Sequence, residues 1–181
     1  MAQSIRKLKS TLKTVEDLGT GLARVELEGE GIGLGIKPGA FAMVEAPGRD
    51  DCILFRPYSY FHVSDDDTVS LLLRDVGKGT HALMAAGLGS SVEIMGPLGN
   101  GFSLEHQTIW AVAGGVGAAP FGTMGHHNGL TVLFGARSSA DTGFSRALEE
   151  VGASVELATD DGSAGFDGNV VDFLRYKLSN Q

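Results

Sequence analysis

Four consecutive residues have side chains that together suit a ligand made of a phosphate and a planar ring: Arg56, Pro57, Tyr58 and Ser59. A guanidinium can form two parallel hydrogen bonds to a phosphate, and a serine hydroxyl can add a third. Tyrosine offers an aromatic face to a flat ring and a hydroxyl to its polar edge. Proline fixes the backbone and lacks an N–H group, which predicts a bend or bulge at a sheet edge or barrel corner. Flavin nucleotides fit this chemistry. The same residues also fit an ordinary strand with a surface arginine and a core aromatic.

A second candidate for phosphate binding is the glycine-rich run Gly77-Lys78-Gly79-Thr80, which precedes an expected short helix starting near Thr80. Free N–H groups at a helix N-terminus form an anion site, and the helix dipole favours negative charge there. A plain turn between a strand and a helix would have a similar sequence. The run alone leaves both readings open.

A third glycine cluster, Gly114-Gly115-Val116-Gly117, follows a continuous apolar run at residues 108–113. Such a run is typical of a strand covered on both faces. A strand, a glycine-rich turn and a helix form the general arrangement that binds dinucleotide phosphates, although the full G-x-G-x-x-G spacing is missing. Residues 120–130 are also short for a parallel crossover, which normally takes a dozen or more residues. We therefore expect a first helix of one or two turns at most.

The elements that must position these motifs change character along the chain. Period-2 alternation and frequent turn signals predict six strands in the first half, and buried runs alternating with helical patterns predict an α/β second half. The expected fold is a six-stranded antiparallel β-barrel (residues 1–102) followed by a small, truncated parallel α/β nucleotide-binding lobe (residues 103–181). The strands are expected at residues 4–15, 22–28, 40–44, 52–63, 69–74, 91–95, 108–113, 130–134 and 154–159.

Composition excludes several classes of function. The formal net charge of −8 argues against a nucleic-acid partner, and no apolar run approaches the roughly 20 residues of a membrane span. No signal-peptide core follows the basic N-terminus, so we expect a cytoplasmic protein. Cys52 is the only cysteine, which leaves no intrachain disulfide and no thiolate metal cage. Residues 65–67 lack spaced partners for a metal, and His126-His127 is expected to be an exposed loop.

The order of the motifs resembles one family. It is similar to the electron-transfer subunit of type B dihydroorotate dehydrogenase, an enzyme of pyrimidine biosynthesis, within the ferredoxin reductase-like superfamily. The resemblance covers roughly residues 20–175, and the glycine-rich run at residues 96–102 is its most specific part. The motifs that carry it are Arg56-Pro57-Tyr58-Ser59, Gly77-Lys78-Gly79-Thr80, Gly96-Pro97-Leu98-Gly99-Asn100-Gly101-Phe102, Gly114-Gly115-Val116-Gly117, Gly135-Ala136-Arg137-Ser138 and Ala158-Thr159-Asp160-Asp161-Gly162-Ser163.

The resemblance implies FAD in the barrel and NAD(H) in the α/β half. In that case Arg56 and Ser59 hold the flavin phosphates, and Tyr58 packs on or beside the isoalloxazine. Two further flavin-binding segments are implied, together with contacts to NAD(H) from the third glycine cluster. They comprise Leu72, Leu73 and Arg74, then Gly79 and Thr80, then Gly114, Gly115 and Gly117, with Arg137 and Ser138 on the adenosine side.

Two departures from the family shape the functional expectation. Members carry four cysteines that hold a [2Fe–2S] cluster, whereas this chain has one, so we expect no cluster here. The chain also stops before the strand that closes the lobe beside the nicotinamide, so we expect weak NAD(H) binding. The leading function is a flavoprotein that passes electrons between NAD(H) and a catalytic dehydrogenase subunit. The alternatives are a stand-alone flavin or ferredoxin-type reductase, and a non-enzymatic paralogue that serves as a flavin-binding or assembly module.

Overall fold

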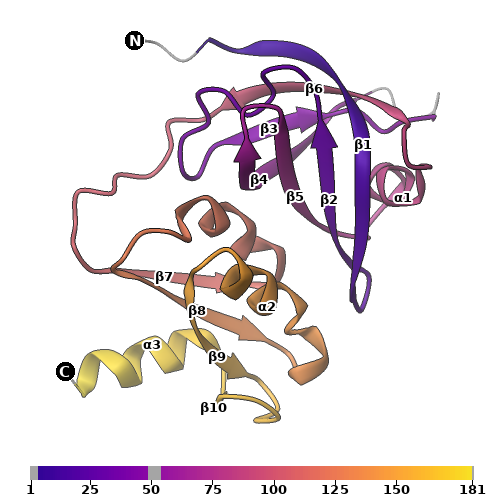
Figure 1. Ribbon diagram of the computed structural model, residues 1–181. Coiled ribbons are helices and arrows are strands. Elements are labelled where there is room, and N and C mark those ends of the chain that lie inside the picture. Colours follow the sequence, from indigo (N-terminus) through magenta and orange to yellow (C-terminus); the bar gives the residue numbers. More distant parts are fainter. Residues whose placement is uncertain (1–3, 49–53, 181) are drawn as a thin grey trace. The chain divides into compact units, whose positions relative to one another are not determined.

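The computed structural model describes residues 4–48 and 54–180 and divides the chain into two compact units, Met1–Phe102 and Ser103–Gln181 (Figure 1). Cys52, at the start of the expected fourth strand, lies outside the described residues. The first unit is a closed antiparallel barrel with strand order β1-β2-β5-β4-β3-β6, which confirms the predicted barrel. Its elements are β1 (Arg6–Gly19), β2 (Leu22–Glu28), β3 (Phe41–Val44), β4 (Arg56–Asp65), β5 (Thr68–Arg74), α1 (Lys78–Ala85) and β6 (Ser91–Leu98).

Alternation along the strands builds the barrel core. In β2 and β5, Val25 lies opposite Leu71 and Leu27 lies opposite Val69, and all four side chains are fully buried. Side chains two residues apart point to the same face of a strand, so these cross-strand pairs line the interior and fix the register. Tyr60 of β4 is buried in the same cluster, where loss of solvent raises the pKa of its phenol to about 12.

The glycine cluster at residues 29–33 is explained by close contact with the β4–β5 hairpin. The Gly31 N–H donates to Asp67 Oδ1 over 2.6 Å, and the Gly33 N–H donates to the Asp66 carbonyl over 2.8 Å. A Cβ on Gly33 would collide with the Asp65 carbonyl oxygen and lie 2.9 Å from Val63 Cγ1. The hairpin that contains these aspartates therefore holds the loop at residues 29–33 in place.

Among the described residues, no group of His, Cys, Asp and Glu is arranged to hold a metal ion.

Gly33→Ala should lower the free energy of unfolding by about 1–3 kcal/mol, because the new methyl group meets a hairpin backbone that hydrogen bonds hold in place. Urea denaturation followed by circular dichroism measures the change. Gly87→Ala is the matched control, since a Cβ there would have only Ser90 Oγ nearby, at 3.9 Å. Equal stability of the two variants would contradict this account of the loop.

The second unit is a parallel sheet with strand order β10-β9-β8-β7 and helices on it, which confirms the predicted α/β class. Helix α3 lies along one face, where Val170 packs so tightly that a Cβ on Gly135 would come within 2.8 Å of it (Figure 1). The elements are β7 (Ile109–Gly114), the 3₁₀ helix η1 (Gly115–Met124), β8 (Leu130–Ala136), the 3₁₀ helix η2 (Ser139–Asp141), α2 (Gly143–Glu150), β9 (Ser154–Thr159), β10 (Phe166–Asp167) and α3 (Val170–Ser179).

The connection between β7 and β8 corrects the expectation of one or two helical turns. Residues 115–129 complete a parallel crossover, and the ten-residue η1 includes Pro120. A 3₁₀ helix rises about 2 Å per residue, compared with 1.5 Å for an α-helix, so a short segment can still span the sheet. The two-residue strand β10 was not predicted from the sequence either.

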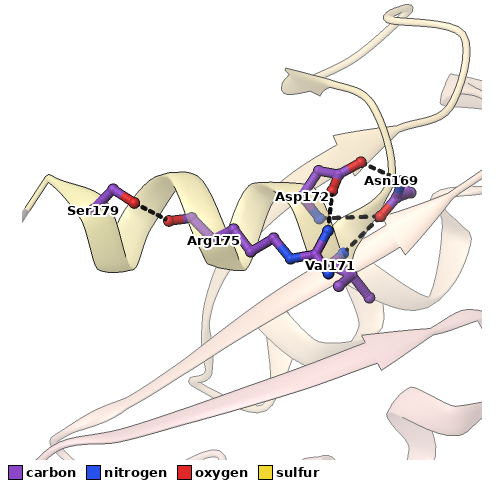
Figure 2. A network of polar contacts seen from close by, with 5 residues as sticks. All are labelled: Asn169, Val171, Asp172, Arg175 and Ser179. Atoms are coloured by element: carbon purple, nitrogen blue, oxygen red, sulfur yellow. Dashed lines mark hydrogen bonds and ion pairs between the residues drawn. The ribbon is translucent and has the colours of Figure 1, made fainter.

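Helix α3 is stabilised by a polar network at its start (Figure 2). The Asn169 side-chain oxygen accepts hydrogen bonds from the N–H groups of Val171 and Asp172, each over 3.0 Å. Asp172 in turn accepts from Asn169 Nδ2 and from Arg175 Nη1. An asparagine at this position satisfies N–H groups that have no partner within the helix.

No helix within residues 4–48 and 54–180 is long and apolar enough to cross a membrane.

Candidate functional site

The barrel brings the arginine of β4 against the first turn of α1. A Cβ built on Gly79 would fall on Nε and Cζ of the Arg56 side chain, so the guanidinium group lies directly against the Gly79 backbone. The same side chain donates from Nη1 to the Leu54 carbonyl. Gly79 has no strained backbone angle, so the contact with Arg56 is what excludes a larger residue there.

The N-terminus of α1 has the properties of an anion site. Its capping residue, Gly77, contributes no side-chain hydrogen bond, and the first turn contains no acidic residue. The first N–H groups of a helix carry partial positive charge, and here a guanidinium lies beside them. Two positive groups in contact repel each other unless an anion shares them. A phosphate, which accepts from both a guanidinium and a helix N-terminus, satisfies that requirement.

A hydrogen bond joins the predicted ring-binding and phosphate-binding segments. Tyr58 Oη and Thr80 Oγ1 are 3.0 Å apart; Thr80 is buried and Tyr58 is half-buried. Burial raises the pKa of Tyr58 above its ordinary value, while the hydrogen bond to Thr80 and the charge of Arg56 act in the opposite direction. The phenol is therefore a neutral hydrogen-bonding group at physiological pH. Ser59 alternates to the other face of β4, where it is paired with Phe41 of β3.

Strand β4 changes its partner at this point. Its first half is paired with β3, from Arg56 opposite Val44 to Ser59 opposite Phe41. Its pairing with β5 begins only at Tyr60, opposite Leu71. The bulge expected at Pro57 occurs instead between Tyr60 and His62, and Pro57 itself sits opposite Met43.

Because of this change of partner, the end of β5 is paired only with β2 among the described residues. Leu72 and Leu73 are 1% and 0% exposed, so their side chains belong to the protein interior. Arg74, opposite Leu22 of β2, is partly exposed. A ligand can therefore contact Leu72 and Leu73 only through their main-chain groups, on the side of β5 that β4 leaves open.

In the second unit, the predicted glycine cluster forms the turn from β7 into η1. Gly115 has φ +52°, a conformation that favours glycine. Gly117 has neither a positive φ nor a steric reason to be glycine, because a Cβ there would have no atom of the described residues within 4 Å beyond its chain neighbours. A glycine with open space above it allows a ligand to approach the main chain closely. The helix that follows is 3₁₀ in place of the α-helix that this motif normally introduces.

One pair beside the barrel site was missed from the sequence. His81 Nδ1 and Asp75 Oδ2 are 2.8 Å apart, and the Asp75 N–H donates to the Gly21 carbonyl. The pair ties the first turn of α1 to the end of β5, and so supports the position of Gly79 and Thr80. A single histidine six residues after an aspartate has no recognisable pattern in a sequence.

Comparison with known proteins agrees with this geometry. A family model described as the oxidoreductase FAD-binding domain matches residues 8–102, which is the barrel. The electron transfer subunit of dihydroorotate dehydrogenase B (NAD(+)) from Listeria monocytogenes is 31% identical over 182 residues, covering 93% of this chain and 70% of that protein. The chain belongs to this family of electron transfer subunits.

Relatives in the family extend beyond the region that matches. The electron transfer subunit from Shouchella clausii is 34% identical over 158 residues, and the match covers 82% of this chain but only 61% of that protein. Among solved structures, the ferredoxin reductase in carbazole 1,9a-dioxygenase superimposes with a TM-score of 0.83 at 19% identity, covering 98% of this chain and 59% of that one. That likeness shows a shared fold for the barrel and the α/β lobe.

Replacing Thr80 with valine should raise the pKa of Tyr58 further, because valine keeps the shape of threonine but removes the hydrogen bond that lowers this pKa. Titration of ¹³Cζ-labelled tyrosine by NMR measures the change. The chain has only three tyrosines, so Tyr60 and Tyr176 are internal references. A Tyr58 pKa that stays the same or falls in the variant would contradict the role of Thr80.

Proposed function

We propose that this chain is a flavoprotein that passes electrons between NAD(H) and a partner oxidoreductase of the dihydroorotate dehydrogenase kind. The barrel, residues 1–102, binds FAD, and residues 103–181 form the lobe that receives NAD(H). The observation that carries the proposal is the Arg56 guanidinium held against the uncapped N-terminus of α1, an arrangement that favours an anion in contact with both. Family membership supports FAD as the molecule that provides the anion.

The residues of the barrel fit a flavin dinucleotide. Arg56, Gly79 and Thr80 supply positive charge and hydrogen-bond donors for the pyrophosphate. Tyr58 supplies a neutral aromatic group to the flavin ring. The backbone at residues 72–74, left open by β4, supplies main-chain donors and acceptors next to these groups. FAD, when bound, supplies the redox chemistry, and the protein holds it in place and sets its surroundings.

Arg56→Ala should weaken FAD binding about 10- to 150-fold, since a hydrogen bond to a charged group contributes about 1.5–3 kcal/mol. Fluorescence titration of FAD with the purified protein measures the affinity. Arg175→Ala, which removes an exposed arginine of α3, is the control and should bind FAD like the wild type. Unchanged flavin affinity in Arg56→Ala would overturn the assignment of the site.

A second variant tests the same contact without removing charge. Gly79→Ala places a methyl group where the guanidinium lies, so the Arg56 side chain must move away. Weaker FAD binding in this variant, with the helical circular dichroism retained, would show that the position of the charge matters. Wild-type affinity in Gly79→Ala would show that Arg56 does not need to contact the helix.

For NAD(H), we propose weak binding at the turn formed by Gly114, Gly115 and Gly117, with Arg137 and Ser138 on the adenosine side. The open space at Gly117 and the positions of these residues at the carboxyl ends of β7 and β8 support the site. Two features weaken it. The 3₁₀ helix has poorer hydrogen-bond geometry than an α-helix, and among the described residues β7 has a strand on one side only. A lobe with fewer packed elements opens more easily.

The flavin-loaded protein should therefore be reduced slowly by NADH when no partner is present. Rapid mixing with micromolar NADH, followed at the flavin absorbance maximum, measures the rate. Loss of flavin absorbance within milliseconds would show that the lobe is fully competent by itself. Steady NADH oxidation with a small soluble acceptor would favour the alternative of a stand-alone reductase over an electron-transfer subunit.

The proposal also covers the partner protein and the [2Fe–2S] cluster. The relatives are electron transfer subunits of dihydroorotate dehydrogenase B, so we propose a catalytic dehydrogenase subunit as partner, in the cytoplasm. With Cys52 the only cysteine, these 181 residues are proposed to hold no [2Fe–2S] cluster by themselves. Near-stoichiometric iron in the purified chain alone would contradict this.

A further inference from the structure

The carboxylate of Asp75 lies next to the start of α1 but binds a side chain of the helix and not its free N–H groups. Asp75 precedes the capping residue Gly77 by two positions. Its Oδ2 atom is 2.8 Å from Nδ1 of His81, and because a carboxylate only accepts hydrogen bonds, the imidazole is the donor. Within the described part of the chain, no hydrogen bond joins this carboxylate to the Gly77 N–H.

Three other aspartates show what a carboxylate in such a turn does when nothing intervenes. Each accepts a hydrogen bond from the backbone N–H two residues further on, over 2.8–3.0 Å: Asp17, Asp65 and Asp161. This local bond is the reason that aspartate is common in turns. For Asp75 the equivalent donor is the N–H of Gly77, at the start of α1. The bond to His81 therefore takes the place of a bond at the anion site.

A carboxylate at the start of α1 would compete with a phosphate. Both are anions that accept hydrogen bonds from a helix N-terminus. The Arg56 guanidinium, which lies against Gly79, attracts either of them. An acceptor on the same chain also has the advantage of a high effective concentration over a ligand from solution. An unrestrained Asp75 would thus lower the affinity of the site for its ligand.

The bond between Asp75 and His81 contributes little to the stability of the fold. The two side chains are 33% and 65% exposed, and exposed pairs of this kind have small effects on stability. The backbone of Asp75 is fixed independently, because its N–H donates to the Gly21 carbonyl over 2.8 Å. The main effect of the imidazole is therefore on the direction in which the carboxylate points.

We propose that Asp75 is an internal competitor for the anion site at the start of α1, and that His81 keeps the site free by holding its carboxylate away. The inference rests on the proposed function, because the ligand that gains access is the flavin phosphate. It deepens that function by adding a positioning residue: His81 acts through Asp75 and does not itself touch the ligand.

Fluorescence titration of FAD with four forms of the full chain tests the proposal. His81→Ala should bind FAD about 3- to 10-fold more weakly than the wild type, the size expected when one hydrogen bond competes for the site. Asp75→Ala should bind FAD at least as tightly as the wild type, since the competitor is gone and the backbone bond to Gly21 remains. The double variant His81→Ala/Asp75→Ala should match Asp75→Ala. Equal weakening in all three variants would make the pair a structural tie and overturn the proposal.

Two further variants identify the group that matters. His81→Asn keeps an N–H donor at about the position of Nδ1 and should bind FAD like the wild type, whereas binding as weak as that of His81→Ala would overturn the role of this hydrogen bond. Lys13→Ala is the matched control, because it breaks an exposed ion pair with Glu28 elsewhere on the barrel. It should leave the FAD affinity unchanged, and a loss equal to that of His81→Ala would show that the effect is not specific.

A readout without flavin separates failure of this inference from failure of the proposed function. In ¹⁵N NMR spectra of the flavin-free chain, the Gly77 amide proton of His81→Ala should move downfield and exchange more slowly with water, because the carboxylate now accepts from it. The double variant should reverse both changes. An unchanged Gly77 amide in His81→Ala would overturn the inference and leave the flavin site standing. A Gly77 amide that responds as expected in a chain that binds no FAD would instead refute the proposed function.

Discussion

The exchange of partners along β4 is the constraint on which the barrel site depends. The strand is paired with β3 up to Ser59 and with β5 from Tyr60 onward. A barrel closes only when its strands are tilted and staggered, so one strand can leave a neighbour before the sheet ends. Here the departure leaves the last residues of β5 unpaired with β4, and the start of β4 lies beside the first turn of α1. Arg56, the Tyr58 hydroxyl and the N-terminus of α1 lie close together because of the register in which β4 pairs with β3 and β5.

The electrostatics of the site follow from the contact between the Arg56 guanidinium and the N-terminus of α1. A guanidinium beside a helix N-terminus is unfavourable without an anion, because both carry positive charge. The chain as a whole has a formal charge of −8, so this local concentration of positive charge is opposite in sign to the net charge of the protein. Such a contrast attracts a phosphate to one place on an otherwise acidic protein. The half-buried, neutral Tyr58 adds a hydrogen bond without adding a charge that would oppose the phosphate.

Local patterns were sufficient to predict much of this fold. The alternation at residues 22–28 marks β2 to the residue, and the apolar runs mark β7, β8 and β9. Strand β10 could not be predicted, because its two residues follow a polar, glycine-containing loop and are held by pairing with β9 alone. The 3₁₀ form of η1 also depends on tertiary context, since Pro120 and the small residues around it are compatible with several helical forms.

The candidate site, too, could be predicted only in part from the sequence. The types and spacing of Arg56, Tyr58, Gly79 and Thr80 pointed to a phosphate and a ring, but whether the two segments touch depends on the closure of the barrel. The Tyr58–Thr80 hydrogen bond and the Asp75–His81 pair join residues whose proximity is set by that closure and by the start of α1. No local pattern records either contact.

The contact between Arg56 and Gly79 has a consequence for how these two positions can vary during evolution. Gly79 of α1 is free of backbone strain, and the Arg56 side chain of β4 occupies the space of its missing Cβ. A chain that lost the arginine would therefore lose the reason for the glycine, and alanine would then be favoured there because it is the better helix former. The two positions are thus expected to change together among relatives, with alanine tolerated at one only where the other has become small.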